Sequence, residues 1–311
     1  MFPDGVLFAR AAAPDGTPHS AEHVLTLLLT SLDERPPPDA DTAELLRRYR
    51  LASHERRLLV VLDDVVAEQD IEQFVPNSPH AAVVLTGDRR LPTVTHEDTV
   101  CLGPLASADA VELLAVIGGR ETVLGHPAAA REVAEYCDGL PLALRLVGAR
   151  LAARPRWTVT DLTARLADPS RRLHELGYGG QSLHGTLTAA ARRLPGDARE
   201  LLRRLGALSG PEFSAADLTE DPHLEPLVEA RLEHLADAWF LLPSANDARG
   251  RMRFRLPPLP HLVSRELTAA PTNNRLWPAC AADATCARSP AGPRPSRNRP
   301  RKRLRGRVRL L

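Results

Sequence analysis

Two short runs of continuous apolar residues constrain the fold of this chain more than any other feature. The first is Leu58–Leu62 and the second lies in residues 81–86, with a short helix predicted near 67–74 between them. Each run is partly β-branched and too short to form a buried helix of its own. Such runs are typical of strands that are buried on both faces of a parallel sheet. The sequence therefore predicts an open parallel α/β sheet.

Shorter segments complete this N-terminal domain, which is predicted to span residues 1–104. A strand is expected at Val6–Ala9, before the first apolar run, and another at Val100–Leu102, after the second run. Apolar residues at helical spacing predict a helix over about 20–32. Asp41 is placed as the N-cap of a second helix, because its side chain can accept a hydrogen bond from a free amide of the first turn.

From residue 105 onward the pattern is almost entirely helical, and it divides into a helical domain (105–181) and a winged-helix-like domain (182–270). Ser107 is placed as the N-cap of the first helix. Two apolar segments joined by a polar turn, 239–243 and 251–256, predict a β-hairpin. The predicted helices span about 107–117, 127–137, 140–153, 158–168, 182–193, 196–207, 223–237 and 259–268.

The charges of the chain divide it into two unlike parts. Residues 271–311 carry ten arginines and Lys302 against one acidic residue, Asp283, which is a net charge of +10. The preceding 270 residues carry 29 basic and 38 acidic groups, a net charge of −9. The tail is expected to be disordered, because it has too few apolar residues to bury. It either binds nucleic acid or an anionic surface through phosphate contacts, or is an unselected end such as a frameshift product.

Composition excludes several other classes of protein. No apolar run is long enough to cross a membrane, and the N-terminus has no secretory pattern. The four cysteines show no C-x-x-C spacing and no dense framework, so neither a zinc site nor a disulfide scaffold is expected. We therefore expect a cytoplasmic protein.

Polar residues follow both apolar runs. Asp63 and Asp64 come directly after the first run, and Thr86 and Arg89 follow the second. Acidic residues at the carboxyl edge of a parallel sheet are suited to Mg²⁺, which prefers hard oxygen ligands. A polar residue and an arginine beside them could contact a phosphate. The alternative is that these are ordinary solvent-exposed strand ends and a charged surface loop.

A third string is Gly139-Leu140-Pro141-Leu142-Ala143-Leu144, in which glycine ends one helix and proline begins the next. Together with LLVVLDDV and VVLTGDRRL, in this order and spacing, it resembles the NB-ARC module of STAND-class signal-transduction ATPases. The chain is most similar to actinobacterial regulators of the SARP/AfsR type, and the resemblance covers roughly residues 1–268. It implies a partial P-loop NTPase sheet, followed by a helical and a winged-helix part.

The resemblance implies a molecular switch that holds ADP when closed and exchanges it for ATP on activation. Asp63 would coordinate Mg²⁺, and Asp64, the candidate catalytic residue, would orient or activate water. Thr86 and the neighbouring Arg89 would sense the γ-phosphate, and Pro141 would pack against the adenine.

Three departures from the family pattern weaken this expectation. The phosphate loop GxxxxGK[ST] is missing from the 311 residues, and Lys302 is the only lysine. Asp88 stands where the family has an arginine. Pro257 and Pro258 stand where the family has its His-Asp pair. We therefore expect a truncated or degenerate member with weak nucleotide binding, and we leave open whether it is an active ATPase.

The alternative function is a protein-interaction scaffold, or a remnant, that binds no nucleotide. In either case we expect protein partners or self-association, because a sheet without the phosphate-loop strand and helix has an uncovered edge and an incomplete apolar face. DNA is a further expected partner, through a fused or missing domain or through the basic tail. No membrane partner is expected.

Overall fold

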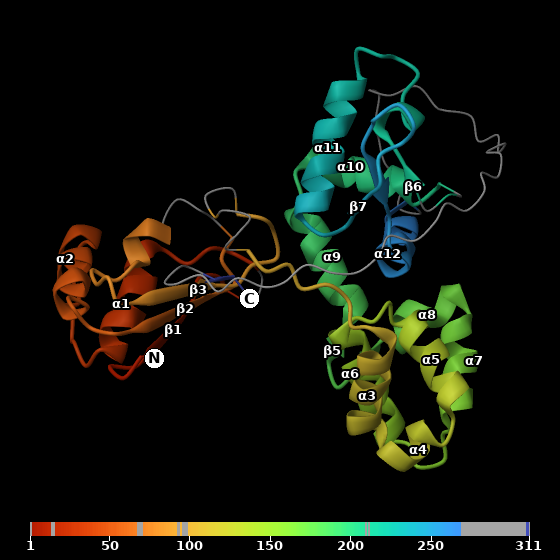
Figure 1. Cartoon of the computed structure of the whole chain (residues 1–311), viewed down its shortest axis with the longest axis horizontal. Helices are drawn as coiled ribbons and strands as arrows, with labels where there is room; N and C mark the ends of the chain where they lie inside the picture. Colours follow the sequence, from red (N-terminus) through yellow and green to blue (C-terminus); the bar gives the residue numbers. More distant parts are fainter. Residues whose placement is uncertain are drawn as a thin grey trace. The chain divides into compact units, whose positions relative to one another are not determined.

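The computed structural model describes residues 2–13, 16–66, 71–91, 94, 99–208, 210, 212–268 and 309–310. The chain forms two compact units that divide between Leu102 and Gly103 (Figure 1). Nearly all of the basic tail, as well as the predicted helical segment at 67–70, lies outside the described residues.

The first unit contains a parallel sheet in the order β1-β2-β3, formed by Val6–Arg10, Leu59–Asp63 and Ala82–Leu85. Val6 pairs with Leu59, and Leu59 pairs with Ala82, so the three strands run in register. A two-residue strand, β9 (Arg309–Leu310), pairs in parallel with β3. The parallel α/β sheet that the apolar runs predict is therefore confirmed.

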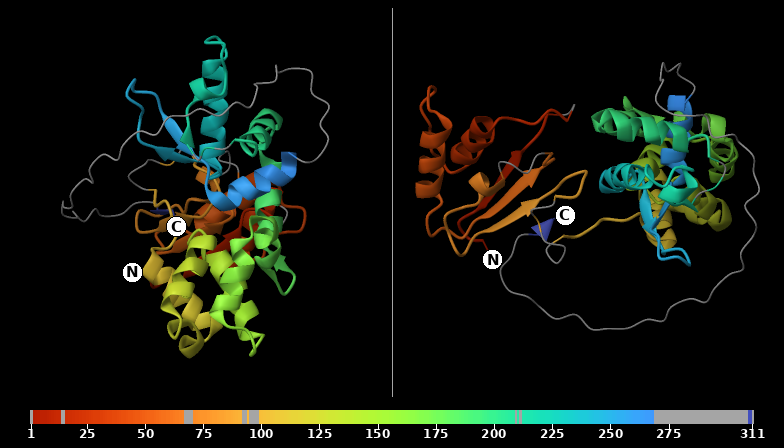
Figure 2. Two further views of the ribbon diagram at one scale, coloured as in Figure 1. Left: turned by 90° about the vertical axis from the view of Figure 1, so that its right-hand side faces the viewer. Right: turned by 90° about the horizontal axis from the view of Figure 1, so that it is seen from above.

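Two helices and one helical turn complete the first unit: α1 (Ala21–Ser31), α2 (Thr42–Ala52) and the 3₁₀ turn η1 (Ile71–Phe74). The predicted cap of the second helix is present, because the Asp41 side chain accepts a hydrogen bond from the Glu44 amide at 2.8 Å. Both helices lie on the same side of the strands (Figure 2).

The core of the first unit fills the space between these helices and one face of the sheet. Alternate strand residues point into it, as Leu7 and Ala9 do in β1. The buried Tyr49 hydroxyl donates a hydrogen bond of 2.9 Å to the carbonyl of Phe74, which ties α2 to η1. The buried cluster consists of Leu7, Ala9, Val24, Leu25, Leu28, Leu29, Leu32, Leu45, Tyr49, Leu58, Val60, Leu62, Val65, Phe74, Val83, Leu85 and Leu91.

The opposite face of β1 is apolar but exposed. Val6 and Phe8 are 62% and 56% exposed, although they alternate with the buried Leu7 and Ala9. Among the described residues, β1 pairs with β2 alone, so its other edge is also free. An exposed apolar face beside a free strand edge is the arrangement that natural sheets usually cover.

One predicted strand is wrong. Residues Val100–Leu102 have no regular structure, and Val100 and Leu102 are 49% and 74% exposed. The physical reason is that an isolated short strand gains stability only from a paired neighbour, and no described strand lies against this segment.

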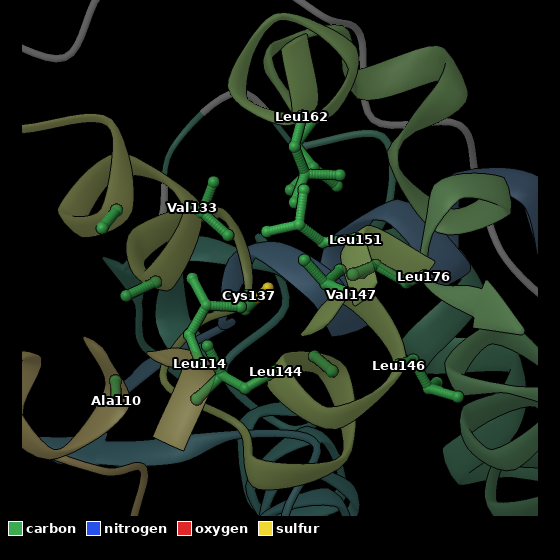
Figure 3. Packing of buried hydrophobic residues seen from close by; sticks show 14 of the residues in the cluster. Ala110, Leu114, Val133, Cys137, Leu144, Leu146, Val147, Leu151, Leu162 and Leu176 are labelled. Carbon is green, nitrogen blue, oxygen red and sulfur yellow. The ribbon is translucent and has the colours of Figure 1, made fainter. Parts of the chain in front are cut away.

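The second unit begins with six helices around one apolar core. Ser107 is the first residue of α3 rather than its cap, since the N-cap is Ala106, which makes no side-chain cap hydrogen bond. Figure 3 shows Leu114, Val133 and Cys137 converging in this core, where Cys137 is fully buried. The helices are α3 (Ser107–Gly118), α4 (Arg120–Leu124), α5 (Pro127–Tyr136), α6 (Pro141–Ala152), α7 (Val159–Ala167) and α8 (Pro169–Glu175).

The remainder of the second unit combines helices with two small antiparallel sheets. The predicted hairpin is present as β7 and β8, and a third strand that the sequence did not predict, β6, pairs with β8. The short helices α4 and α8 and the β4–β5 hairpin were also not predicted. The elements are β4 (Gly177–Tyr178), β5 (Gln181–Ser182), α9 (Leu183–Arg193), α10 (Gly196–Leu205), β6 (Glu212–Phe213), η3 (Ala215–Asp217), α11 (Glu225–Asp237), β7 (Leu242–Ser244), β8 (Arg253–Arg255) and α12 (Pro258–Thr268).

The exposed face of β1 leads to a prediction about self-association. We expect Phe8→Thr to lower the oligomer fraction measured by sedimentation velocity at equal protein concentration, because it removes the largest exposed apolar side chain of β1 while keeping a good strand former. Leu51→Gln is the matched control, since Leu51 is 64% exposed on α2. A monomeric wild-type protein, or an equal decrease in both variants, would contradict the prediction.

Candidate functional site

The carboxyl edge of the parallel sheet gathers polar side chains from all three strands. Arg10 ends β1 and is paired in register with Asp63, which ends β2. Leu62 pairs with Leu85, so Thr86, the first residue after β3, lies beside Asp63. Because parallel strands end at a common edge, residues that are far apart in the chain meet here.

Thr86 connects the two acidic residues. Its hydroxyl donates a hydrogen bond of 2.6 Å to Oδ1 of Asp63 and accepts one of 3.1 Å from the backbone amide of Asp64. The structure therefore brings together Asp63, Asp64 and Thr86, three of the site residues that the sequence predicts.

Arg10 is a site residue that sequence reasoning missed. Its Nη2 lies 3.5 Å from Oδ2 of Asp63, and its Nε lies 3.6 Å from Oδ2 of Asp64. The signal was present, because Arg10 follows an apolar segment just as the two acids do. The predicted strand ended one residue too early, at Ala9, which left Arg10 outside the set of strand-end residues.

The turn after β2 has a special backbone conformation. Asp64 has a φ of 59°, in the left-handed region that aspartate tolerates better than most residues. The amide of Val65 then donates a hydrogen bond of 2.8 Å to the Thr86 carbonyl. A Cβ atom at Gly87 would lie only 2.9 Å from the carbonyl oxygen of Val65. Glycine at position 87 therefore allows the segments that follow β2 and β3 to approach closely.

The structure does not bring Arg89 to the acidic pair. Its Nε lies 3.7 Å from Oδ1 of the adjacent Asp88, and within the described part of the chain no ion pair joins it to Asp63 or Asp64. Arg89, which was expected to contact a phosphate, thus forms an ion pair with Asp88 instead.

Pro141 belongs to the second unit, where it is the first residue of α6. Before it, Gly139 has a φ of 64°, and a Cβ atom there would lie 2.7 Å from the carbonyl of Leu105. Only glycine fits this turn. The position of Pro141 is therefore set by a tight connection between two helices.

Asp138, in the same turn, holds a distant helix. Its carboxylate accepts a hydrogen bond of 2.9 Å from the amide of Leu259, in the first turn of α12. Burial raises the pKa of Asp138 above its ordinary value, although this hydrogen bond and the charges of Arg172 and Arg255 act in the opposite direction. Ionised Asp138 therefore costs the folded state free energy.

The donor set at the sheet edge fits a magnesium ion better than a softer metal. Asp63, Asp64 and Thr86 offer only oxygen atoms, and Mg²⁺ is commonly held by one or two carboxylates together with phosphates and water. Among the described residues, no group of three or more His, Cys, Asp or Glu side chains is arranged to hold a metal ion. Arg10 already neutralises part of the carboxylate charge.

The chain is 34% identical over 258 residues to the "Regulatory protein AfsR" of Streptomyces griseus, covering 81% of this chain and 26% of that protein. It is 34% identical to the protein of the same name from Streptomyces coelicolor, covering 81% of this chain and 25% of that one. The chain thus spans about a quarter of the length of these curated relatives.

A weaker match is to the "Apoptotic protease-activating factor 1" of Danio rerio, with 28% identity over 182 residues, 56% of this chain and 14% of that protein. No protein-family model matches the chain. These findings confirm the resemblance to the NB-ARC module of STAND-class proteins. Within that class, the chain is a relative of the regulatory protein AfsR.

The first prediction for this site concerns Thr86. We expect Thr86→Val to lower the free energy of unfolding by about 1–2 kcal/mol, because two hydrogen bonds of the hydroxyl are lost at nearly constant volume. Thr86→Ser keeps the hydroxyl and is expected to lose less than half as much. Urea denaturation measures both, and equal losses would show that the hydroxyl has no such role.

The second prediction concerns the pH dependence of stability. Because the folded pKa of Asp138 is raised, the contribution of this residue to stability falls as the pH rises from about 4 through that pKa. Asp138→Asn keeps an acceptor for the Leu259 amide but cannot ionise, so its melting temperature should exceed that of the wild type at pH 7.5 and approach it near pH 4.

Asp161→Asn is the matched control with the opposite sign. The Thr158 backbone and side-chain hydrogen bonds lower the pKa of Asp161, so its ionised form stabilises the folded state. This variant should be less stable than the wild type at pH 7.5, and the difference should shrink as the pH falls. A pH-independent effect of Asp138→Asn would contradict the interpretation.

Proposed function

We propose that this chain is a regulatory switch of the NB-ARC type that binds ADP or ATP with magnesium at the carboxyl edge of its sheet. The observation that carries this proposal is the cluster of Asp63, Asp64 and Thr86, joined by hydrogen bonds of 2.6 and 3.1 Å. The sequence similarity to AfsR and to the apoptotic factor also supports this proposal.

Each residue of the proposed site has a separate role. Asp63 would hold Mg²⁺, Asp64 would orient or activate water, and Thr86 would contact the γ-phosphate. Bound magnesium would supply positive charge that neutralises phosphate oxygens. Arg89 is proposed to contact the same phosphate after its ion pair with Asp88 opens, and Pro141 is proposed to pack against the adenine.

Nucleotide binding by this chain alone is proposed to be weak. Arg10 lies within 3.6 Å of both carboxylates, so a magnesium ion must compete with a cation that is already in place. The lack of a GxxxxGK[ST] motif among the 311 residues removes the backbone amides and lysine that usually bind the phosphates.

The alternative is a protein-interaction scaffold, or a remnant, that does not bind nucleotide. The ion pairs of Arg10 favour this alternative, because the two acids are already paired with a side chain of the same protein. Pro257 and Pro258 also favour it, since proline side chains offer no donor for a phosphate.

We further propose that residues 1–104, 105–181 and 182–270 act as nucleotide-binding, helical and winged-helix-like domains. The three-stranded sheet β6-β8-β7, packed with α10 and α11, supports the last of these.

Protein partners or self-association are proposed through the exposed face of β1. DNA is proposed as a target through another domain or the basic tail. No described helix is long and apolar enough to cross a membrane.

A thermal melt with saturating Mg·ADP or Mg·ATP tests the function. A ligand that binds only the folded state raises the melting temperature, with a gain of about 2.7 kcal/mol at one hundred times Kd. We expect a small rise with millimolar nucleotide that Asp63→Asn abolishes.

Asp39→Asn is the matched control, because it removes the same charge from an exposed position of the first unit. It should leave the nucleotide-dependent rise unchanged. No rise in the wild type with either nucleotide would favour the scaffold, and a rise that survives Asp63→Asn would refute the assignment of this site.

A further inference from the structure

A cavity of about 620 Å³ lies in the second unit, between the end of α6, the helix α8 and the β4–β5 hairpin. Its volume is in the range of small-molecule sites. None of the residues discussed above for nucleotide binding lines it. Pro141 begins α6, whereas the cavity starts at Arg150, nine residues or about 14 Å further along the helix. The polar side chains of its wall include Arg150, Arg154, His174, Tyr178, Gln181 and His184.

The wall is anchored by a buried carboxylate shared between two arginines. Glu175, whose side chain is 3% exposed, lies 2.9 Å from Nη2 of Arg150 and 3.4 Å from Nη1 of Arg165. Arg150 also donates to the carbonyls of Glu175 and Gly177, at 3.1 and 3.3 Å. One negative charge thus faces two positive ones, and Arg150 is fixed in place.

Arg154 adds a third positive charge to this wall. Its guanidinium carbon lies 4.7 Å from the ring centroid of Trp157 and 5.9 Å from that of Tyr178, and its Nη1 donates to the Arg150 carbonyl at 3.2 Å. In the described part of the chain, no carboxylate forms an ion pair with it. Most of the five N–H donors of a guanidinium are therefore available for a ligand.

The remaining parts of the wall are a tight hairpin turn and one acid that is paired with a histidine. Gly179 and Gly180 have φ values of 59° and 81°, as a two-residue type I′ hairpin requires, so the β4–β5 turn is tight. Among the described residues that line the cavity, Glu266 is the only acid, and its Oε2 lies 2.7 Å from Nε2 of His184.

We propose that this cavity binds a small molecule that carries an oxyanion, either a phosphate or a carboxylate group, with Arg154 as its principal cation. A planar guanidinium with two parallel N–H groups matches both kinds of oxyanion. Trp157 and Tyr178 hold the guanidinium, so little ordering is needed when the ligand binds. The inference is independent of the proposed nucleotide site, because that site depends on Asp63 and Mg²⁺.

The test uses the fluorescence of Trp157, which lies against the proposed binding cation. The full chain carries Trp239→Phe and Trp277→Phe, so that Trp157 alone reports, and is titrated with pyrophosphate in EDTA. We expect a saturable change in fluorescence. Arg154→Gln should weaken the apparent affinity at least tenfold, whereas the matched control Arg156→Gln, an exposed position two residues away, should change it less than twofold.

The outcomes separate this site from general attraction to positive charge. Equal effects of both variants, or no saturable change in the wild type, would overturn the inference. Arg154→Lys is a second variant that controls for loss of the fold. It keeps the positive charge but loses the planar guanidinium, so we expect an affinity between those of the wild type and Arg154→Gln. A parallel titration with citrate decides between phosphate and carboxylate ligands. Asp63→Asn should leave the titration unchanged, which separates this result from the nucleotide melt.

Discussion

The parallel register of three short strands is the constraint on which the rest of the first unit depends. Because β1, β2 and β3 run side by side in one direction, their last residues meet at a single edge. There the Thr86 hydroxyl bonds to Asp63 at 2.6 Å, and Arg10 lies between the two acids. A slip of one residue in any strand would turn these side chains to the other face.

The same register places the two acids where either an arginine or a metal ion could neutralise them. A cluster of carboxylates at a sheet edge needs positive charge, and in this chain Arg10 supplies it. A magnesium ion with a nucleotide would supply it in the proposed switch. Arg10 therefore keeps both acids in ion pairs, and a magnesium ion in the proposed switch would have to compete with it.

The second unit depends on tight turns and buried charges. Gly139 allows the close contact with the Leu105 carbonyl, and Asp138 beside it holds the amide of Leu259. At the other end of α6, buried Glu175 shares its charge between Arg150 and Arg165. Both arrangements place an acid where burial is costly, and hydrogen bonds and arginines offset part of that cost.

The sequence by itself determined the elements whose signal is local. The apolar runs specified β2 and β3, the side chain of Asp41 capped α2, and the Gly-Leu-Pro string separated α5 from α6. Asp63, Asp64 and Thr86 could be placed together because parallel strands share an edge. Only the tertiary structure decided the rest, since it depends on partners that are distant in the chain. It left Val100–Leu102 unpaired, brought Arg10 to the acids, and assembled the arginine-lined cavity from segments that carry no common motif.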